Sequence, residues 1–116
     1  MRLPPTDLRL REIQSYVAEM VRQKGFARES LRDVLLLLIE ETGELARTIR
    51  ERSGLKSRTR TKTAEERLGA ELADCFIYIV DLVNLADVDF EAAVRRKLAS
   101  DARRRWRSSP HLEQSS

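Results

Sequence analysis

Two stretches of the chain are apolar on nearly every side of a helix, and they restrict its fold more than any other feature. Residues 34–39 (Val-Leu-Leu-Leu-Leu-Ile) contain no polar side chain, and residues 76–83 are interrupted only by Asp81. A helix of this kind must be covered on several sides. The two other helices that the sequence predicts are amphipathic and cannot cover both stretches. We therefore expect a second copy of the chain to complete a symmetric helical bundle.

The periodicity of the sequence is helical throughout, and no segment shows the sustained apolar and polar alternation of a half-buried strand. We predict an all-α fold, a four-helix bundle completed by dimerisation. The first helix follows Pro4-Pro5, with Thr6 as its cap, and stops at Gly25. The other three are predicted over about 30–52, 64–86 and 89–107, with caps formed by Ser30 and Asp33, by Thr63 and Glu66, and by Asp89.

A chain of 116 residues suits one domain. We place it at 1–107, with a basic, mobile loop over 53–63 and a disordered tail over 108–116. No apolar run approaches the roughly 20 residues of a membrane span, and the N-terminus lacks the apolar region of a signal peptide. We therefore expect a cytoplasmic protein without membrane contact. Cys75 and His111 are single residues of their types, which argues against a disulfide, a cysteine zinc site and histidine-dependent nucleophilic catalysis.

Charge is segregated along the chain. Residues 47–67 carry eight basic and three acidic side chains, residues 68–94 six acidic and no basic ones, and residues 95–107 seven basic and one acidic. An acidic, apolar segment between two basic ones suggests carboxylates that hold cations while basic groups meet a polyanion. One alternative is a non-enzymatic helical dimer that binds nucleic acid through the basic loop and the C-terminal arginine cluster. Another is a structural bundle with solvated acidic faces.

Five carboxylates are spaced so that two helices each present an acidic patch. At about 100° per residue, Glu40, Glu41 and Glu44 share one arc of about 100°, directly after the first apolar stretch. Glu71 and Asp74 lie about 60° apart on the next helix. Packed together, the two patches would repel each other unless a cation lay between them. Ligands that are all oxygen favour Mg²⁺, with Mn²⁺ as a substitute, over Zn²⁺.

The residues Glu40-Glu41-Thr-Gly-Glu44-Leu-Ala and Glu71-Leu-Ala-Asp74-Cys-Phe-Ile-Tyr78 resemble the signature of the MazG-type all-α nucleoside triphosphate pyrophosphohydrolases, Glu-Glu-x-x-Glu followed by Glu-x-x-Asp. The resemblance covers roughly residues 8–105. It implies a homodimer or homotetramer that uses Mg²⁺ to split a (deoxy)nucleoside triphosphate between its α and β phosphates. The products would be a monophosphate and pyrophosphate, and the role nucleotide-pool house-cleaning.

The resemblance also implies roles for eight residues by their position in the motifs. The implied metal ligands are Glu41, Glu44, Glu71 and Asp74. The implied catalytic residues are Glu40 and Glu41, and Glu40 would bind a second ion or orient the attacking water. The implied substrate-binding residues are Tyr78, which lines the nucleotide pocket, and two basic residues that face the phosphates, Lys97 and Arg104.

The fourth helix departs from the family pattern. Where the family often has Asn followed later by Arg-Tyr, this chain has Asp101, then Arg104-Arg105, with Trp106 one place further on. Asp101 puts a negative charge where a neutral amide would tolerate phosphate. The few aromatic residues do not define a base preference.

Overall fold

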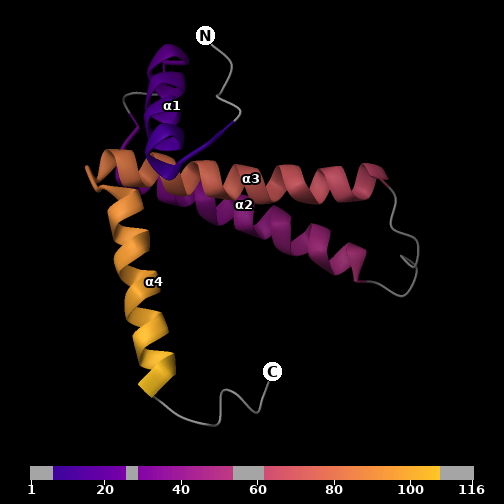
Figure 1. The fold of residues 1–116 in the computed structure, drawn as a ribbon. Helices are drawn as coiled ribbons and strands as arrows, with labels where there is room; N and C mark the ends of the chain where they lie inside the picture. The colour runs from indigo at the N-terminus through magenta and orange to yellow at the C-terminus, as the bar shows by residue number, and fades with distance from the viewer. Residues whose placement is uncertain (1–6, 26–28, 54–61, 108–116) are drawn as a thin grey trace.

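The computed structural model describes residues 7–25, 29–53 and 62–107, and within these ranges the chain is helical and contains no strand. Four helices follow one another (Figure 1): α1 (Leu10–Gln23), α2 (Leu31–Arg52), α3 (Lys62–Leu85) and α4 (Phe90–Arg107). The all-α prediction is confirmed for this part of the chain.

The helices α2 and α3 lie side by side and form the central pair of the fold (Figure 1). Val34 of α2 and Val80 of α3, one from each apolar stretch, have 0% and 1% of their surface exposed. At the other end of the pair, Arg52 of α2 binds Glu65 of α3 at 2.8 Å. The end of α2 therefore meets the start of α3, which makes the pair antiparallel. All five predicted carboxylates lie on these two helices.

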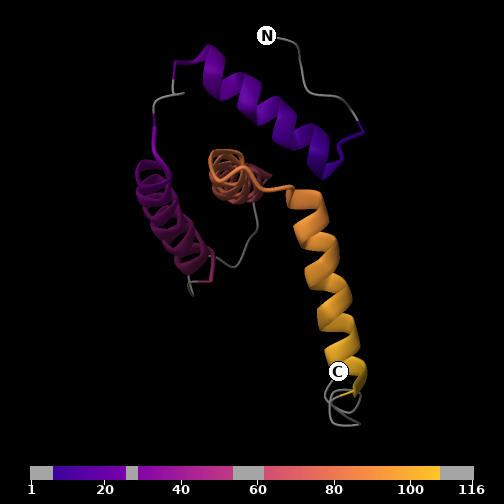
Figure 2. The ribbon, with the colours of Figure 1, turned by 90° about the vertical axis from the view of Figure 1, so that its left-hand side faces the viewer.

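The helices α1 and α4 meet near the C-terminal end of α3. α1 crosses α3, and its Val17 is only 3% exposed. Seen along α3, α2 and α4 lie on opposite sides of that helix, and α4 extends away from the other three (Figure 2). Within one chain, the acidic motifs and the basic fourth helix are therefore on different arms of the molecule.

Three predicted helix signals are confirmed. Ser30 Oγ accepts a 3.1 Å hydrogen bond from Asp33 N, and the Asp33 carboxylate accepts one of 3.1 Å from Ser30 N, which is the predicted capping box of α2. Asp89 accepts from Ala92 N at 3.1 Å and caps α4. Gly25 follows α1 with a φ of 78°, a conformation that favours glycine.

Two predicted helix starts are wrong. α1 begins at Leu10, and its N-cap Arg9 makes no side-chain cap bond, so Thr6 does not cap it. α3 begins at Lys62, which places Thr63 inside its first turn rather than at its cap. Thr6 itself, residues 54–61 of the predicted loop and the tail 108–116 lie outside the described residues.

The turn between α3 and α4 is closed by its own backbone. Asp87 N donates to Asn84 O and Val88 N donates to Val83 O, both at 3.1 Å. This pair of bonds is the Schellman arrangement that often ends a helix. Asp87 has a φ of 56°, in the left-handed region that Asp adopts more readily than most residues. The chain therefore makes a sharp, defined break before α4.

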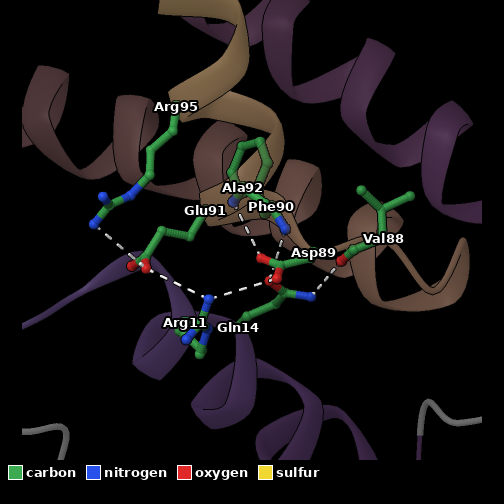
Figure 3. A network of polar contacts seen from close by, with 8 residues as sticks. All are labelled: Arg11, Gln14, Val88, Asp89, Phe90, Glu91, Ala92 and Arg95. Atoms are coloured by element: carbon green, nitrogen blue, oxygen red, sulfur yellow. Dashed lines mark hydrogen bonds and ion pairs between the residues drawn. The ribbon is translucent and has the colours of Figure 1, made fainter.

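Gln14 of α1 holds this turn from outside (Figure 3). Its Nε2 donates to Val88 O at 2.8 Å and its Oε1 accepts from Phe90 N at 3.2 Å. Its backbone oxygen accepts from Asn84 Nδ2 at 3.0 Å. Phe90 is the first residue of α4, where the backbone N–H groups have no partner within the helix. One side chain thus joins α1 to the turn and to the start of α4.

Ion pairs add little to this junction. Arg11 lies 3.5 Å from Asp89 and 3.6 Å from Glu91, and Arg95 lies 3.8 Å from Glu91 (Figure 3). Both arginine side chains are mostly exposed, and exposed pairs of this kind contribute about 0–1 kcal/mol each. The direction of α4 therefore depends on Gln14 and the turn that it holds, together with the ring contact between Phe76 of α3 and Phe90 of α4, whose centroids are 6.3 Å apart.

Replacing Gln14 should destabilise the fold more than replacing a surface glutamine on the same helix. Gln14→Ala removes two hydrogen bonds and leaves Phe90 N without its acceptor, so we expect a loss of about 1–3 kcal/mol in the free energy of unfolding. Gln23→Ala is the matched control, because Gln23 contacts only Glu19 on the exposed face of α1. Urea unfolding measures both. Equal effects of the two substitutions would show that the Gln14 contacts do not hold α4.

Much of the apolar surface of α2 is exposed in the single chain. Leu35, Leu36 and Ile39 belong to the first apolar stretch and are 47%, 54% and 56% exposed. The four helices of one chain thus leave uncovered the surface that we expect a second copy to cover. The dimer itself stays a prediction.

Candidate metal centre

The middle of α2 presents the three glutamates of the first motif. Glu41 is half-buried, whereas Glu40 and Glu44 are exposed. Glu44 accepts a 2.7 Å charged hydrogen bond from Arg47, one turn further along the helix. Only Glu41 of the three is thus partly withdrawn from water.

On α3, Glu71 is half-buried, with 14% of its side chain exposed. Its Oε1 accepts a 2.8 Å hydrogen bond from Thr48 Oγ1 of α2 and lies 3.4 Å from Arg67 Nε. Its Oε2 is fully covered and has no hydrogen-bond partner among the described residues. A covered carboxylate oxygen without a partner is unfavourable. Glu71 therefore offers one oxygen atom that a bound cation would satisfy.

The two acidic motifs converge at Glu41. Partial burial raises the pKa of Glu41, and the neighbouring carboxylates of Asp74, Glu44 and Glu71 raise it further. The fold thus brings together all four residues predicted as metal ligands, at the cost of electrostatic repulsion.

The negative charge of the cluster also acts on the pKa of two neighbouring side chains. Burial raises the pKa of the Cys75 thiol, and the charges of the cluster raise it further. The pKa of Tyr78 is raised by burial first and then by Glu41, Asp74, Glu29 and Glu40. Tyr78 therefore lies beside the cluster, and Glu40 is one of the charges that raise its pKa. Its contact with a substrate stays a prediction.

The carboxylates are near one another but not in a coordination sphere. No group of three His, Cys, Asp or Glu side chains in the described ranges has the arrangement of a metal site. Carboxylates that repel one another spread apart unless a cation draws them together. The residues nonetheless fit a hard divalent cation, because every donor is a carboxylate oxygen and Glu71 Oε2 lacks a partner. Metal binding stays a prediction.

The two predicted phosphate-binding residues lie away from this cluster. Lys97 Nζ is 3.2 Å from Asp101 and Arg104 is 3.5 Å from the same carboxylate oxygen. All three are on α4, which leads away from α2 (Figure 2). Asp101, the departure from the family pattern, thus pairs with both basic residues in the single chain.

Sequence reasoning missed several residues around the cluster. Thr48 lies four residues after Glu44, so its place on the same face of α2 could have been found from helical spacing. Arg67 lies four residues before Glu71 and could have been found in the same way. Glu29 precedes its helix, and no spacing rule relates it to Tyr78.

The fold and these motifs define a helical domain with an acidic centre, and comparison with known families identifies it. Residues 29–106 match the family model described as the MazG nucleotide pyrophosphohydrolase domain. The chain belongs to this family, which confirms the resemblance of its motifs. The matched residues span α2, α3 and nearly all of α4. No curated protein matches the chain.

Two further predictions meet the structure only in part. The alternative function, nucleic-acid binding, depends on the basic loop and the C-terminal arginine cluster. Residues 54–61 of that loop lie outside the described part of the chain, and no observation favours this alternative. In the described ranges, none of the helices has the length and apolar character needed to cross a membrane.

Thr48 should stabilise Glu71 directly. Thr48→Val keeps the shape of the side chain but removes the hydroxyl that donates to Glu71 Oε1, so the free energy of unfolding should fall by about 1–2 kcal/mol. Thr42→Val is the matched control, since the exposed Thr42 hydroxyl donates only to Ile39 O of its own helix. A double-mutant cycle with Glu71→Gln, read by urea unfolding, isolates the pair. Additive effects of Thr48→Val and Glu71→Gln would contradict the contact.

Proposed function

We propose that the chain hydrolyses a (deoxy)nucleoside triphosphate between its α and β phosphates in the presence of Mg²⁺, releasing a monophosphate and pyrophosphate. Membership of the nucleotide pyrophosphohydrolase domain family supports a hydrolase of this kind. The observation that carries the proposal is the crowding of Glu41 against Asp74 beside the unpartnered Glu71 Oε2. A cluster so unfavourable by itself is best explained by a bound cation.

Glu41, Glu44, Glu71 and Asp74 would hold the Mg²⁺. Bound there, the ion would supply positive charge that polarises the phosphoryl oxygens and activates a water molecule. The chain would bring Glu71 to this role with one oxygen already fixed by Thr48. Glu44 would need to leave Arg47, an exposed ion pair that costs little to break.

A carboxylate near the reacting water would act as its general base. Glu40 is exposed and its charge acts on Tyr78, and Glu41 lies among the carboxylates that would hold the ion. Either residue would take the proton that the water loses. Lys97 and Arg104 would neutralise the triphosphate by exchanging Asp101 for phosphate oxygens, because their present ion pairs are exposed and weak.

The products distinguish this reaction from ordinary phosphatase activity. Purified protein with Mg²⁺, incubated with ordinary and modified nucleoside triphosphates, should yield monophosphate and pyrophosphate. In ¹⁸O-labelled water, the label will show whether the α or the β phosphorus is attacked, since it enters the monophosphate in the first case and pyrophosphate in the second. Diphosphate and orthophosphate as products would exclude the proposal.

Glu41→Gln tests the cluster, and Glu12→Gln is its control. Glu41→Gln should reduce turnover at least 100-fold, as expected when an essential acid or metal ligand is lost, whereas Glu12→Gln on the exposed face of α1 should leave it unchanged. Without nucleotide, Mg²⁺ should raise the melting temperature of the wild type more than that of Glu41→Gln. The metal-free variant should be at least as stable as the wild type at neutral pH, because the wild-type pKa is raised and ionising Glu41 there opposes folding.

We also propose that the chain is a homodimer or a homotetramer, in which a second copy covers the exposed apolar surface of α2. Sedimentation velocity should give at least twice the 13.4 kDa chain mass at micromolar concentration. Leu36→Glu places a charge on this surface and should weaken assembly. Leu8→Glu is the control, because Leu8 is similarly exposed but lies before α1. A stable wild-type monomer would contradict the proposal.

A further inference from the structure

Asp81 is a buried acid that the metal centre does not use. It interrupts the apolar residues 76–83 of α3 and is 7% exposed. No hydrogen bond or ion pair joins it to any residue in 7–25, 29–53 or 62–107. A buried polar group without a partner opposes folding. A chain under selection for packing alone would have an apolar side chain here.

The Asp81 carboxyl is nevertheless not sealed. Within the described part, Glu71 Oε2 is the fully covered side-chain oxygen that lacks a partner, and the Asp81 oxygens are not fully covered in this way. Asp81 therefore combines low exposure with side-chain oxygens that keep some contact with solvent. Its burial and the neighbouring charge of Glu29 both raise its pKa.

Asp81 continues the line of functional residues along α3. It follows Tyr78 by three residues and Asp74 by seven, so the three share one face of the helix, and Asp81 lies about 10 Å from Asp74 along the axis. Glu29, just before α2, raises the pKa of both Tyr78 and Asp81. The metal cluster, Tyr78 and Asp81 are thus successive positions along one surface of the α2–α3 pair.

The charges of this pair orient a bound nucleotide. Arg47, Arg50 and Arg52 lie in the last turns of α2, beyond the cluster on the side away from Asp81. Glu29 and Asp81 lie on the other side. Because the acidic end repels phosphate, the β and γ phosphates would extend away from Glu29 and Asp81. The nucleoside would then extend past Tyr78 toward Asp81, over a length comparable with the distance from the α phosphate to the edge of the base.

We infer that Asp81 accepts a hydrogen bond from an N–H group on the edge of the nucleobase, and that it thereby selects among nucleotides. The inference rests on the proposed function in that a nucleotide must occupy the site. A donor is the ligand group that suits both protonation states, since an ionised carboxyl only accepts hydrogen bonds and a protonated one keeps an accepting oxygen beside its O–H donor. Ring N–H and exocyclic amino groups are the donors that bases offer.

Binding of reaction products tests the inference without catalysis. Calorimetry with Mg²⁺ would compare the four deoxynucleoside monophosphates with deoxyribose 5-phosphate, which keeps the sugar and phosphate but lacks a base. At least one monophosphate should bind the wild type roughly tenfold or more tightly than the sugar phosphate. Asp81→Leu should abolish this advantage while the affinity for deoxyribose 5-phosphate stays the same. Asp81→Asn keeps an accepting oxygen and should retain part of it.

Stability separates a base contact from a structural role. Asp81→Leu should be as stable as the wild type or more stable in urea unfolding, because an unpartnered buried acid is replaced by an apolar side chain. An unchanged preference for the base in Asp81→Leu would overturn the inference, as would a wild type that binds no monophosphate better than the sugar phosphate. A loss of sugar-phosphate affinity equal to the loss of monophosphate affinity would place the contact on the sugar and also overturn it. Failure of the proposed function would appear separately, as the absence of pyrophosphate release from any triphosphate.

Discussion

The antiparallel contact between α2 and α3 determines where every carboxylate of the candidate site lies. Val34 and Val80 are buried on these two helices, and Thr48 reaches across to Glu71. With the register fixed in this way, Glu41 is held against Asp74 whether or not their charges repel. Packing and the hydrogen bond from Thr48 to Glu71 thus impose an arrangement that electrostatics alone would disperse. A cation would reverse the sign of that interaction.

The sequence predicted this pair well, because the signals that define it are local or periodic. The capping box of Ser30 and Asp33, the end of α2 at Arg52 and the cap of Asp89 each depend on residues within one turn. The spacing of Glu41, Glu44, Glu71 and Asp74 predicted facing patches, and the charges of the other three act on Glu41, while their role as metal ligands stays a prediction. The starts of α1 and α3 differ from the predicted ones because a local capping pattern is a weak constraint on where a helix begins.

Long-range contacts could not be predicted in the same way. The direction of α4 depends on Gln14, which meets Val88 and Phe90 more than seventy residues later in the chain. No periodicity of α1 marks Gln14 as different from its other polar residues. The positions of Lys97 and Arg104 relative to the acidic cluster follow from that angle and from Asp101. Residue spacing therefore could not predict these positions, although the sequence does show that both residues are basic.

The position of Gln14 also bears on what counts as the smallest working unit of this chain. The family match begins at Glu29 and so contains every carboxylate of the candidate site, but it begins after α1 has ended. A fragment that begins at Glu29 would keep the carboxylates of the candidate site. It would lose Gln14 and its hydrogen bonds to Val88 and Phe90. The recognisable motif and the cooperative folding unit are therefore different segments. Recombination of this domain at residue 29 would therefore yield the α2–α3 pair with an α4 whose direction α1 no longer fixes.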